Sequence, residues 1–270
     1  GIAFALGPAD DQPGGYDVRA TVELGTVKVL ANRIQFGEDG TLFDYVTQGG
    51  QEILYPFKRA TVEITLAERH DLVFLYQPLT VESQTRVPSD LGSPVQVDEV
   101  AFAPGTAIDL KYGFDFWRAS YLYRVVDSPR WGVGIGLSLQ LRNASIVFQS
   151  TDGEQISVNQ NLGPVPILKA RAEYRFSSGV FLGTEVDGFY ASSAFFNGSD
   201  FDFEGSILDA SVRAGVAIHP AADAFLNVRF LGGTAKGTSQ YDDRFWTETV
   251  NRYTENVLST LSVTIGARLR

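Results

Sequence analysis

The chain of 270 residues lacks cysteine and methionine altogether, and it contains only two histidines, His70 and His219. The absence of cysteine excludes a disulfide framework and any thiolate metal site. No apolar run approaches the roughly 20 residues that a membrane-spanning helix needs. The net charge of −10 argues against nucleic acid as a partner, because proteins that bind it carry basic surfaces. We expect a processed mature chain without a signal peptide.

The dominant pattern in the sequence is alternation of apolar with polar or small residues. From Trp131 to Arg142 the odd-numbered residues are large and apolar, whereas the even-numbered ones are glycine, serine, glutamine and arginine. A period of two is typical of β-strands with one buried face. Such segments predict about ten strands, at roughly 16–31, 56–67, 71–86, 106–126, 131–149, 164–176, 179–193, 203–218, 223–238 and 252–269.

The predicted connections alternate between short and long. Short turns are expected near Glu68–Asp71, Asp127–Arg130, Ser177–Gly179 and Pro220–Asp223, and long loops near 32–55, 86–105, 150–163, 193–203 and 238–252. Short turns at one end and long loops at the other are typical of outer-membrane barrels. Slips in the alternation near Val27, Trp117 and Asn143 are interpreted as β-bulges.

Aromatic residues gather toward both ends of the predicted strands, and we interpret them as two girdles at the membrane interfaces. The alternative is that aromatic residues simply favour strands. The group near the short turns is Tyr16, Tyr121, Tyr123, Trp131, Tyr174, Phe176 and Phe225, and the group near the long loops is Tyr55, Phe57, Tyr112, Phe114, Phe148 and Tyr190.

On these patterns, from Tyr16 to Leu269, the chain resembles the bacterial outer-membrane β-barrels, a broad porin-like class of integral membrane proteins. The resemblance rests on pattern and not on a motif, and the chain ends in Arg270 where such barrels commonly end in an aromatic residue. It implies an all-β, antiparallel up-and-down transmembrane barrel in the outer membrane of a Gram-negative envelope. Residues 1–270 would form this single domain, with 1–15 as an N-terminal periplasmic arm. The alternative is a soluble lipocalin-like barrel or a β-sandwich, which would bury its apolar face.

If the apolar face meets lipid, the other face lines the lumen and carries charges of both signs. An arginine or lysine facing lipid at mid-depth would cost roughly 2–4 kcal/mol, which favours this orientation. We interpret the charges as a scaffold of ion pairs, and the alternative is a narrow charge-lined channel for small polar solutes or ions. The predicted network is Arg59, Glu63, Asp109, Lys111, Asp115, Arg118, Arg142, Lys169, Arg171, Glu173, Glu185, Asp187, Asp209, Arg213 and Arg229; Arg19, Glu23, Arg124, Arg175 and Arg268 share its face.

The five predicted long loops contain fourteen acidic and four basic residues, a balance equal to the net charge of the whole chain. An acidic outer surface should attract cations or basic partners, although ordinary solvated loops have the same composition. Aromatic residues in these loops are candidates for a contact surface, or for a cap that packs over the barrel. The candidates for loop contact are Phe195, Phe196, Phe201, Tyr241, Phe245 and Trp246.

These features favour a non-enzymatic barrel that is structural or binds a partner through its acidic, aromatic loops. The alternatives are the narrow channel and an enzyme that modifies envelope lipids. The chain resembles the omptin proteases in strand number only, and both histidines lie in predicted short turns, away from the outer rim. We expect no cofactor, and as partners outer-membrane lipid including lipopolysaccharide and another envelope protein. Asp200, Asp202 and Glu204 are a candidate metal site, although an acidic strand end is the favoured interpretation.

Overall fold

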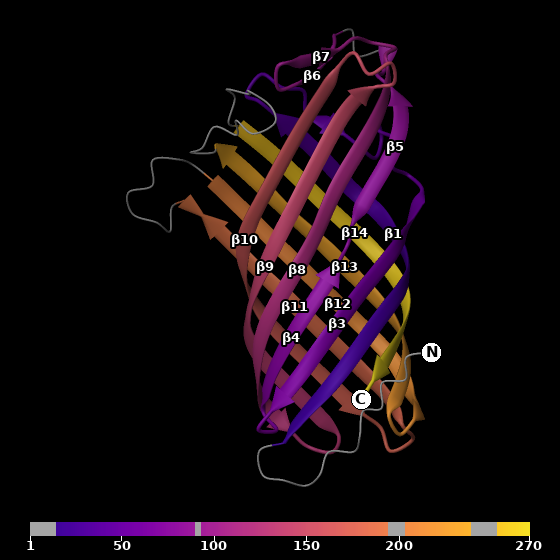
Figure 1. Cartoon of the computed structure of the whole chain (residues 1–270), viewed down its shortest axis with the longest axis vertical. Coiled ribbons are helices and arrows are strands. Elements are labelled where there is room, and N and C mark those ends of the chain that lie inside the picture. Colours follow the sequence, from indigo (N-terminus) through magenta and orange to yellow (C-terminus); the bar gives the residue numbers. More distant parts are fainter. Residues whose placement is uncertain (1–14, 90–92, 194–202, 239–252) are drawn as a thin grey trace.

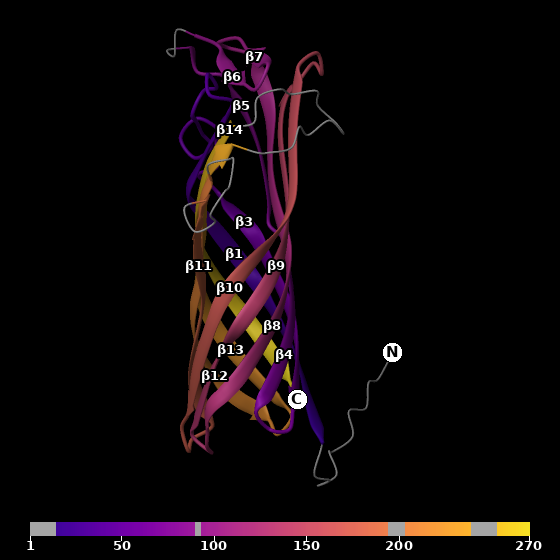
Figure 2. The same ribbon diagram turned by 90° about the vertical axis from the view of Figure 1, so that its left-hand side faces the viewer.

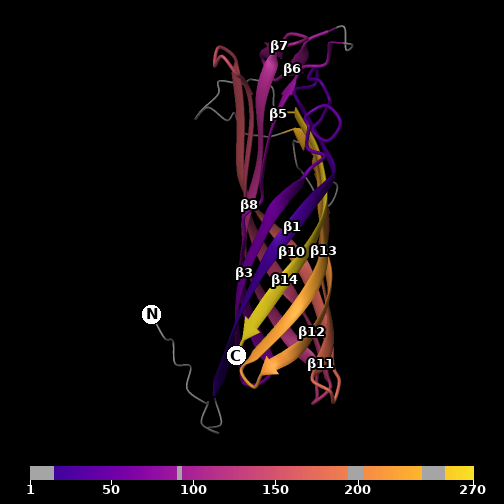
Figure 3. The same ribbon diagram turned by 90° about the vertical axis from the view of Figure 1, so that its right-hand side faces the viewer.

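The structure, a computed structural model, describes residues 15–89, 93–193, 203–238 and 253–270, and it shows a closed antiparallel barrel (Figure 1). Ten strands form the wall, each paired with its neighbours in the chain, and β14 pairs with β1 to close it (Figure 3). The wall strands are β1 (Tyr16–Phe36), β3 (Leu54–Leu66), β4 (His70–Gln77), β8 (Ala107–Asp127), β9 (Trp131–Ser150), β10 (Ile156–Arg175), β11 (Val180–Ser192), β12 (Phe203–His219), β13 (Ala222–Thr238) and β14 (Tyr253–Leu269). Four shorter strands lie in the described connections: β2 (Phe43–Asp44), β5 (Thr80–Arg86), which continues β4 along β8, and the hairpin of β6 (Val95–Val97) and β7 (Val100–Phe102).

The predicted up-and-down barrel of about ten strands is therefore confirmed. At one end the wall strands are joined by short turns at 67–69, 128–130, 176–179 and 220–221, where the sequence predicted them. Among the described residues, no helix is long and apolar enough to cross a membrane.

At the opposite end, one predicted loop is wrong. Residues 150–163 were expected to be a long loop, but β9 and β10 pair from Trp131 and Tyr174 up to Gln149 and Ile156. The polar stretch after Ile156 resembles a loop in sequence, yet its backbone is hydrogen-bonded to β9. As a result β8, β9 and β10, together with β5, rise beyond β11–β14 (Figures 1 and 2). The predicted loops at 193–203 and 238–252 lie almost wholly outside the described residues.

The outward-facing side chains form an apolar belt around the wall. On β9, Ile135, Leu137 and Leu139 are 53%, 62% and 51% exposed. The belt on this strand runs from Trp131 to Leu141, a height of about 25 Å for strands that rise ~3.3 Å per residue at a tilt of ~40°. That height matches the lipid-facing band of an outer-membrane barrel.

Aromatic side chains border the belt at both edges. Trp117 stacks on Tyr76, with ring centroids 5.3 Å apart, toward the upper edge. At the short-turn end, Trp131 contacts Tyr174 with centroids 4.8 Å apart. These outward aromatic pairs lie where interfacial girdles are found in membrane barrels.

The girdle predicted from the long-loop group is wrong for most of its members. Tyr190 is exposed, but the other members face inward, because the interior of the barrel above the belt is apolar and packs them together. Phe225, from the short-turn group, is likewise buried inside. The inward-facing members of the long-loop group are Tyr55, Phe57, Tyr112, Phe114 and Phe148.

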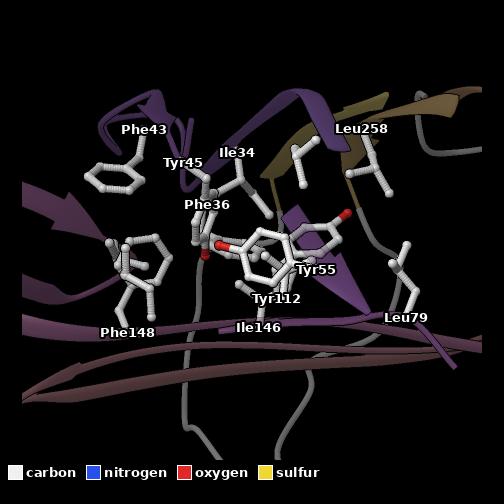
Figure 4. Close-up of a cluster of buried hydrophobic side chains, with 14 of the residues drawn as sticks. Ile34, Phe36, Phe43, Tyr45, Tyr55, Leu79, Tyr112, Ile146, Phe148 and Leu258 are labelled. Carbon is white, nitrogen blue, oxygen red and sulfur yellow. The ribbon is translucent and has the colours of Figure 1, made fainter. Parts of the chain in front are cut away.

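This apolar interior is a packed core (Figure 4). The rings of Phe43 and Phe148 meet edge to face at 5.3 Å, and Tyr45 meets Tyr112 in the same way at 5.8 Å. Phe43 and Tyr45 come from the connection between β1 and β3, which folds inward over the barrel. All four side chains are almost completely buried.

The predicted bulges have two different outcomes. A register shift between Val29 and Ala31 of β1 lies close to the slip expected near Val27. The bulges expected near Trp117 and Asn143 are wrong, since β8 and β9 keep one register through both positions. The sequence pattern changes at these positions because the interior of the barrel becomes apolar, while the same alternate residues continue to point inward.

Candidate functional site

At the height of the belt, the lumen contains a layer of buried charges centred on Asp209 of β12. Arg59 Nη1 and Arg118 Nη1 donate hydrogen bonds to Asp209 Oδ2 at 3.3 and 2.9 Å, and Arg229 donates to Oδ1. Glu23 lies 3.9 Å from both Arg59 and Arg229. All five residues are at most 3% exposed. One carboxylate thereby joins four strands of the wall across the lumen.

Two neighbouring carboxylates on β11 complete this middle layer. Glu185 accepts a hydrogen bond from Arg59 at 3.1 Å and pairs with Lys169 at 3.2 Å. Asp187 accepts a hydrogen bond from Lys169 at 2.9 Å and pairs with Arg118 at 3.1 Å. The layer thus contains four cations and four carboxylates. This balance offsets the cost of removing the charges from water, as buried ion pairs require.

A second cluster lies nearer the short turns and is centred on Asp71, at the start of β4. Arg124 holds both oxygens of Asp71 at 2.8 to 3.1 Å, in the bidentate geometry of strong guanidinium pairs. Arg171 contacts both Asp71 and Glu63. Arg19 pairs with Glu63 at 3.4 Å.

A third cluster lies at the same end and is centred on Asp223, at the start of β13. Arg175 and Arg268 contact this carboxylate at 3.2 and 2.7 Å, and Arg270 donates to it at 2.6 Å. Glu173 pairs with Arg268 at 2.7 Å and with Arg175 at 3.0 Å. The arginine of the last strand is therefore tied to β10 and β13 through two carboxylates.

The structure brings most residues of the predicted network together in these clusters or beside them. Arg142 also faces inward, since it pairs across the strands with buried Phe116, just above the middle layer. The residues placed in the three clusters or lining the lumen beside them are Arg59, Glu63, Arg118, Lys169, Arg171, Glu173, Glu185, Asp187, Asp209, Arg213 and Arg229.

The lumen placement predicted for Asp109, Lys111 and Asp115 is wrong. They lie on the outer face of β8, above the belt, where the outside of the wall meets water. Asp109 accepts a hydrogen bond from Gln84 in an exposed pair at 2.8 Å, and the side chain of Lys111 is 45% exposed. Asp115 accepts from the backbone N–H of Leu79 at 2.9 Å, where β4 gives way to β5.

Asp71 and Asp223 are central to the clusters but were assigned to short turns in the sequence. Both are fully buried. Each is the first residue of a predicted strand and stands two residues before an inward-facing hydrophobic residue, Val73 and Phe225, so applying the alternation from the first strand residue would have found them.

The apolar core rests directly on the middle layer. The guanidinium of Arg118 lies 5.3 Å from the ring centroid of Phe116, which joins the two layers. Higher up, the Tyr112 hydroxyl and the Asn256 amide are hydrogen-bonded across the interior. Because the inward side chains of both layers are buried, the lumen is filled at this height by the side chains themselves.

Inward charges, an outward apolar belt, strand closure and short turns at one end together decide the class. The chain is an outer-membrane β-barrel. The reversed arrangement of a soluble barrel is ruled out by the half-exposed leucines and valines of the belt.

No family model and no curated protein matches the sequence. Among solved structures, the barrel is similar to outer membrane protease OmpT from Escherichia coli, at 11% identity over 93% of this chain and 96% of that chain, with a TM-score of 0.46. It is also similar to a FadL homologue of Pseudomonas aeruginosa, at 7% identity over 93% of this chain and 90% of that chain, with a TM-score of 0.40. A third similar structure is Ail, the attachment invasion locus protein of Yersinia pestis, in complex with the heparin analogue sucrose octasulfate. The identity is 9% over 94% of this chain and 99% of that chain, and the TM-score is 0.34.

The remaining candidate sites lie mostly beyond the described part of the chain. Glu204 is exposed at the start of β12. Within the described residues, no group of three or more histidine, aspartate and glutamate side chains is arranged to hold a metal ion. Outside the described residues are the candidate metal ligands Asp200 and Asp202 and the candidate contact residues Phe195, Phe196, Phe201, Tyr241, Phe245 and Trp246.

Proposed function

We propose that the protein is a sealed, non-enzymatic barrel that anchors a rigid extracellular head in the outer membrane and binds a partner through it. The name head is used below for the described residues 37–53, 80–89, 93–115 and 143–163. The observation that carries the proposal is the filling of the lumen by two successive layers, one charged and one apolar. The alternatives are a conducting channel and an enzyme acting on envelope lipids.

Both layers oppose the passage of ions. In the middle layer, each carboxylate is held by two or more cations from different strands, so the ion pairs cross-link the wall. An ion that reached the apolar core would lose its hydration among rings such as Phe43 and Phe148, which have no polar group to replace the lost water. The barrel is thus better suited to support a structure above the membrane than to conduct through it.

The head is held together by more than its core. Backbone N–H groups and side chains join the inward-folded connection to the β6–β7 hairpin, with Thr41 and Gln96 exchanging two hydrogen bonds of 2.8 and 2.9 Å. Thr85 Oγ1 donates to the carbonyl of Gln48 at 3.0 Å, and Gln155 donates to the carbonyl of Ala101 at 2.7 Å. These contacts fix each described connection against the tall strands, as a binding surface requires.

The described surface of the head is acidic. Glu38, Asp39, Glu52, Glu99 and Glu154 are exposed on three different connections. This arrangement supports a cationic or basic partner, which the negative potential would attract and orient.

The aromatic residues of the described connections do not support a contact role for themselves. Phe43, Tyr45 and Phe102 are fully buried in the core of the head, so they pack as a cap over the barrel. The acidic surface therefore supports the partner proposal by itself.

Planar bilayer recording tests the sealed lumen. The reconstituted barrel should be electrically silent over the range of voltages at which the bilayer is stable. Steady conductance that changes in the Arg213→Ala or Glu185→Ala variant would refute the proposal in favour of transport. A change in the mass of lipid A on expression would refute it in favour of an enzyme.

Binding of an oligolysine peptide to the barrel in nanodiscs tests the acidic head. A variant with the three residues Glu38, Glu99 and Glu154 changed to glutamine should bind about tenfold more weakly, a loss of about 1.4 kcal/mol. A matched variant with Asp17, Asp127 and Glu68 changed to amides at the short-turn end should bind like the unmodified protein. Equal binding by both variants would contradict the role of the head.

A further inference from the structure

The lower half of the lumen contains a cavity of about 330 Å³ below the middle layer. It reaches the short turn between β8 and β9, where Ser128 and Arg130 line it, and it is roofed by Arg59, Arg118 and Lys169. The volume lies within the range of small-molecule sites, which runs from roughly 300 to 1,000 Å³. The cavity is therefore a blind pocket at the opposite end of the barrel from the head.

The lining of the cavity is strongly basic. Among the described residues, eleven arginines and lysines line it, against five carboxylates. Several of the carboxylates that balance these cations, such as Asp71 and Asp223, are fully buried beneath them and do not line the cavity. A solute in the cavity would thus meet guanidinium groups more often than carboxylates.

Arg213 of β12 lines the cavity and has a longer ion pair than the cations of the three clusters. Its nearest carboxylate is Glu185, at 4.0 Å, and Glu185 is already held by Arg59 and Lys169. In the described part of the chain, the Arg213 guanidinium makes no hydrogen bond to the protein, and its side chain is only 15% exposed. Its N–H donors therefore have no hydrogen-bond acceptor among the described residues, and Arg213 lines the cavity.

The guanidinium of Arg213 is nevertheless held in place. It lies over the ring of Phe225, 5.2 Å from the centroid. Its aliphatic stem crosses Gly183, the residue opposite it on β11, where an added Cβ would lie 3.1 Å from Arg213 Cγ. A planar, preorganised fork of donors matches phosphate and carboxylate groups, which accept two parallel hydrogen bonds.

We infer that this cavity binds a small phosphate-bearing solute, with Arg213 as the anchor for the oxyanion. Arg19 and Arg270, whose side chains are 27% and 31% exposed near the mouth, would attract the anion from the periplasmic side. The inference goes beyond the proposed function, because this site faces the other side of the membrane from the acidic head.

Titration calorimetry of the barrel in nanodiscs, with inorganic phosphate and pyrophosphate as probes, tests the inference. We expect saturable binding with one site per chain for at least one probe. Arg213→Gln should weaken it about tenfold or more, as the loss of a charge-assisted bidentate contact does. Arg86→Gln removes the same charge from the exposed head and should leave the affinity unchanged.

Two further variants separate the anchor from general charge and from misfolding. Arg213→Lys keeps the charge but loses the fork, so its affinity should fall between those of the unmodified protein and Arg213→Gln. Gly183→Ala keeps Arg213 but displaces its stem, and it should also weaken binding. Absence of saturable binding in the unmodified barrel, or equal affinities for Arg213→Gln and Arg86→Gln, would overturn the inference.

Discussion

Substitution of Asp209 by asparagine tests whether the middle layer holds the barrel together. The change preserves the shape of the side chain and removes one negative charge from a fully buried position. It leaves Arg59, Arg118 and Arg229 with three carboxylates and Lys169 as neighbours, a layer with one uncompensated positive charge. Breaking a buried ion pair in this way costs about 3–5 kcal/mol, and we expect a loss of that size in the free energy of unfolding.

The assay is reversible urea unfolding of the barrel in lipid vesicles, followed by tryptophan fluorescence. Asp109→Asn, which removes the same charge from the exposed outer face, is the matched control and should change stability by less than about 0.5 kcal/mol. Adding Arg229→Met to Asp209→Asn removes the excess cation and should restore part of the loss, as a positive coupling energy. If Asp209→Asn cost no more than its control, water would have to screen the layer, and the account of a dry cross-link would be refuted.

Three further predictions test the facing, the packing and the head. Leu137→Arg, on the lipid face, should destabilise the barrel by about 2–4 kcal/mol, whereas Gln149→Arg, on the same face of β9 above the belt, should be neutral; equal effects in vesicle unfolding would contradict the position of the belt. Gly266→Val would place its Cβ within 2.2 Å of the Phe225 ring and should cost about 1–3 kcal/mol, with partial recovery in a double variant that carries Phe225→Leu. Burial and an adjacent glutamate raise the pKa of Asp98, at the tip of the β6–β7 hairpin, to about 6, so the folded hairpin binds the proton more tightly than the unfolded one. Its stability should therefore be highest below the unfolded pKa of about 4 and fall as the pH rises to 6, and limited proteolysis should show that Asp98→Asn removes this dependence.

The strand count and the facing of the belt could be predicted because lipid imposes a strict rule. Every second residue of a lipid-facing strand must be apolar, so runs such as Leu261 to Leu269 reveal both the strand and its outward side. The charged lumen followed as the complementary face. Pairing partners could not be predicted in this way, since the contacts of Asp209 with β3, β8 and β13 depend on how ten strands close in space.

The wrong predictions for the region above the belt share one cause. Above the belt the outside of the wall meets water, so the apolar residues of an alternating strand no longer mark its outward face. The polar stretch of β10 after Ile156 therefore resembled a loop, and Asp109 and Lys111 were assigned to the lumen by carrying the lower pattern upward. The spare donors of Arg213 were also hidden, because sequence shows the charge but not the carboxylates that neutralise its neighbours.

Two of the tall strands, β8 and β9, continue from the lipid-facing belt into the water-exposed head. Within the belt, β8 directs Arg118 inward and Trp117 outward; one step higher, Phe116 is inward and Asp115 outward. The inner face thus turns from charged to apolar at the same height at which the outer face turns from apolar to polar. Below this height the apolar side chains face lipid and the polar ones form pairs inside the barrel. Above it the polar side chains face water and the apolar ones pack in the interior. The register continues unbroken through the change. The membrane boundary is therefore marked by the side chains and not by a change in the backbone. Above it, the same strands that cross the lipid enclose an apolar core and expose polar residues to water.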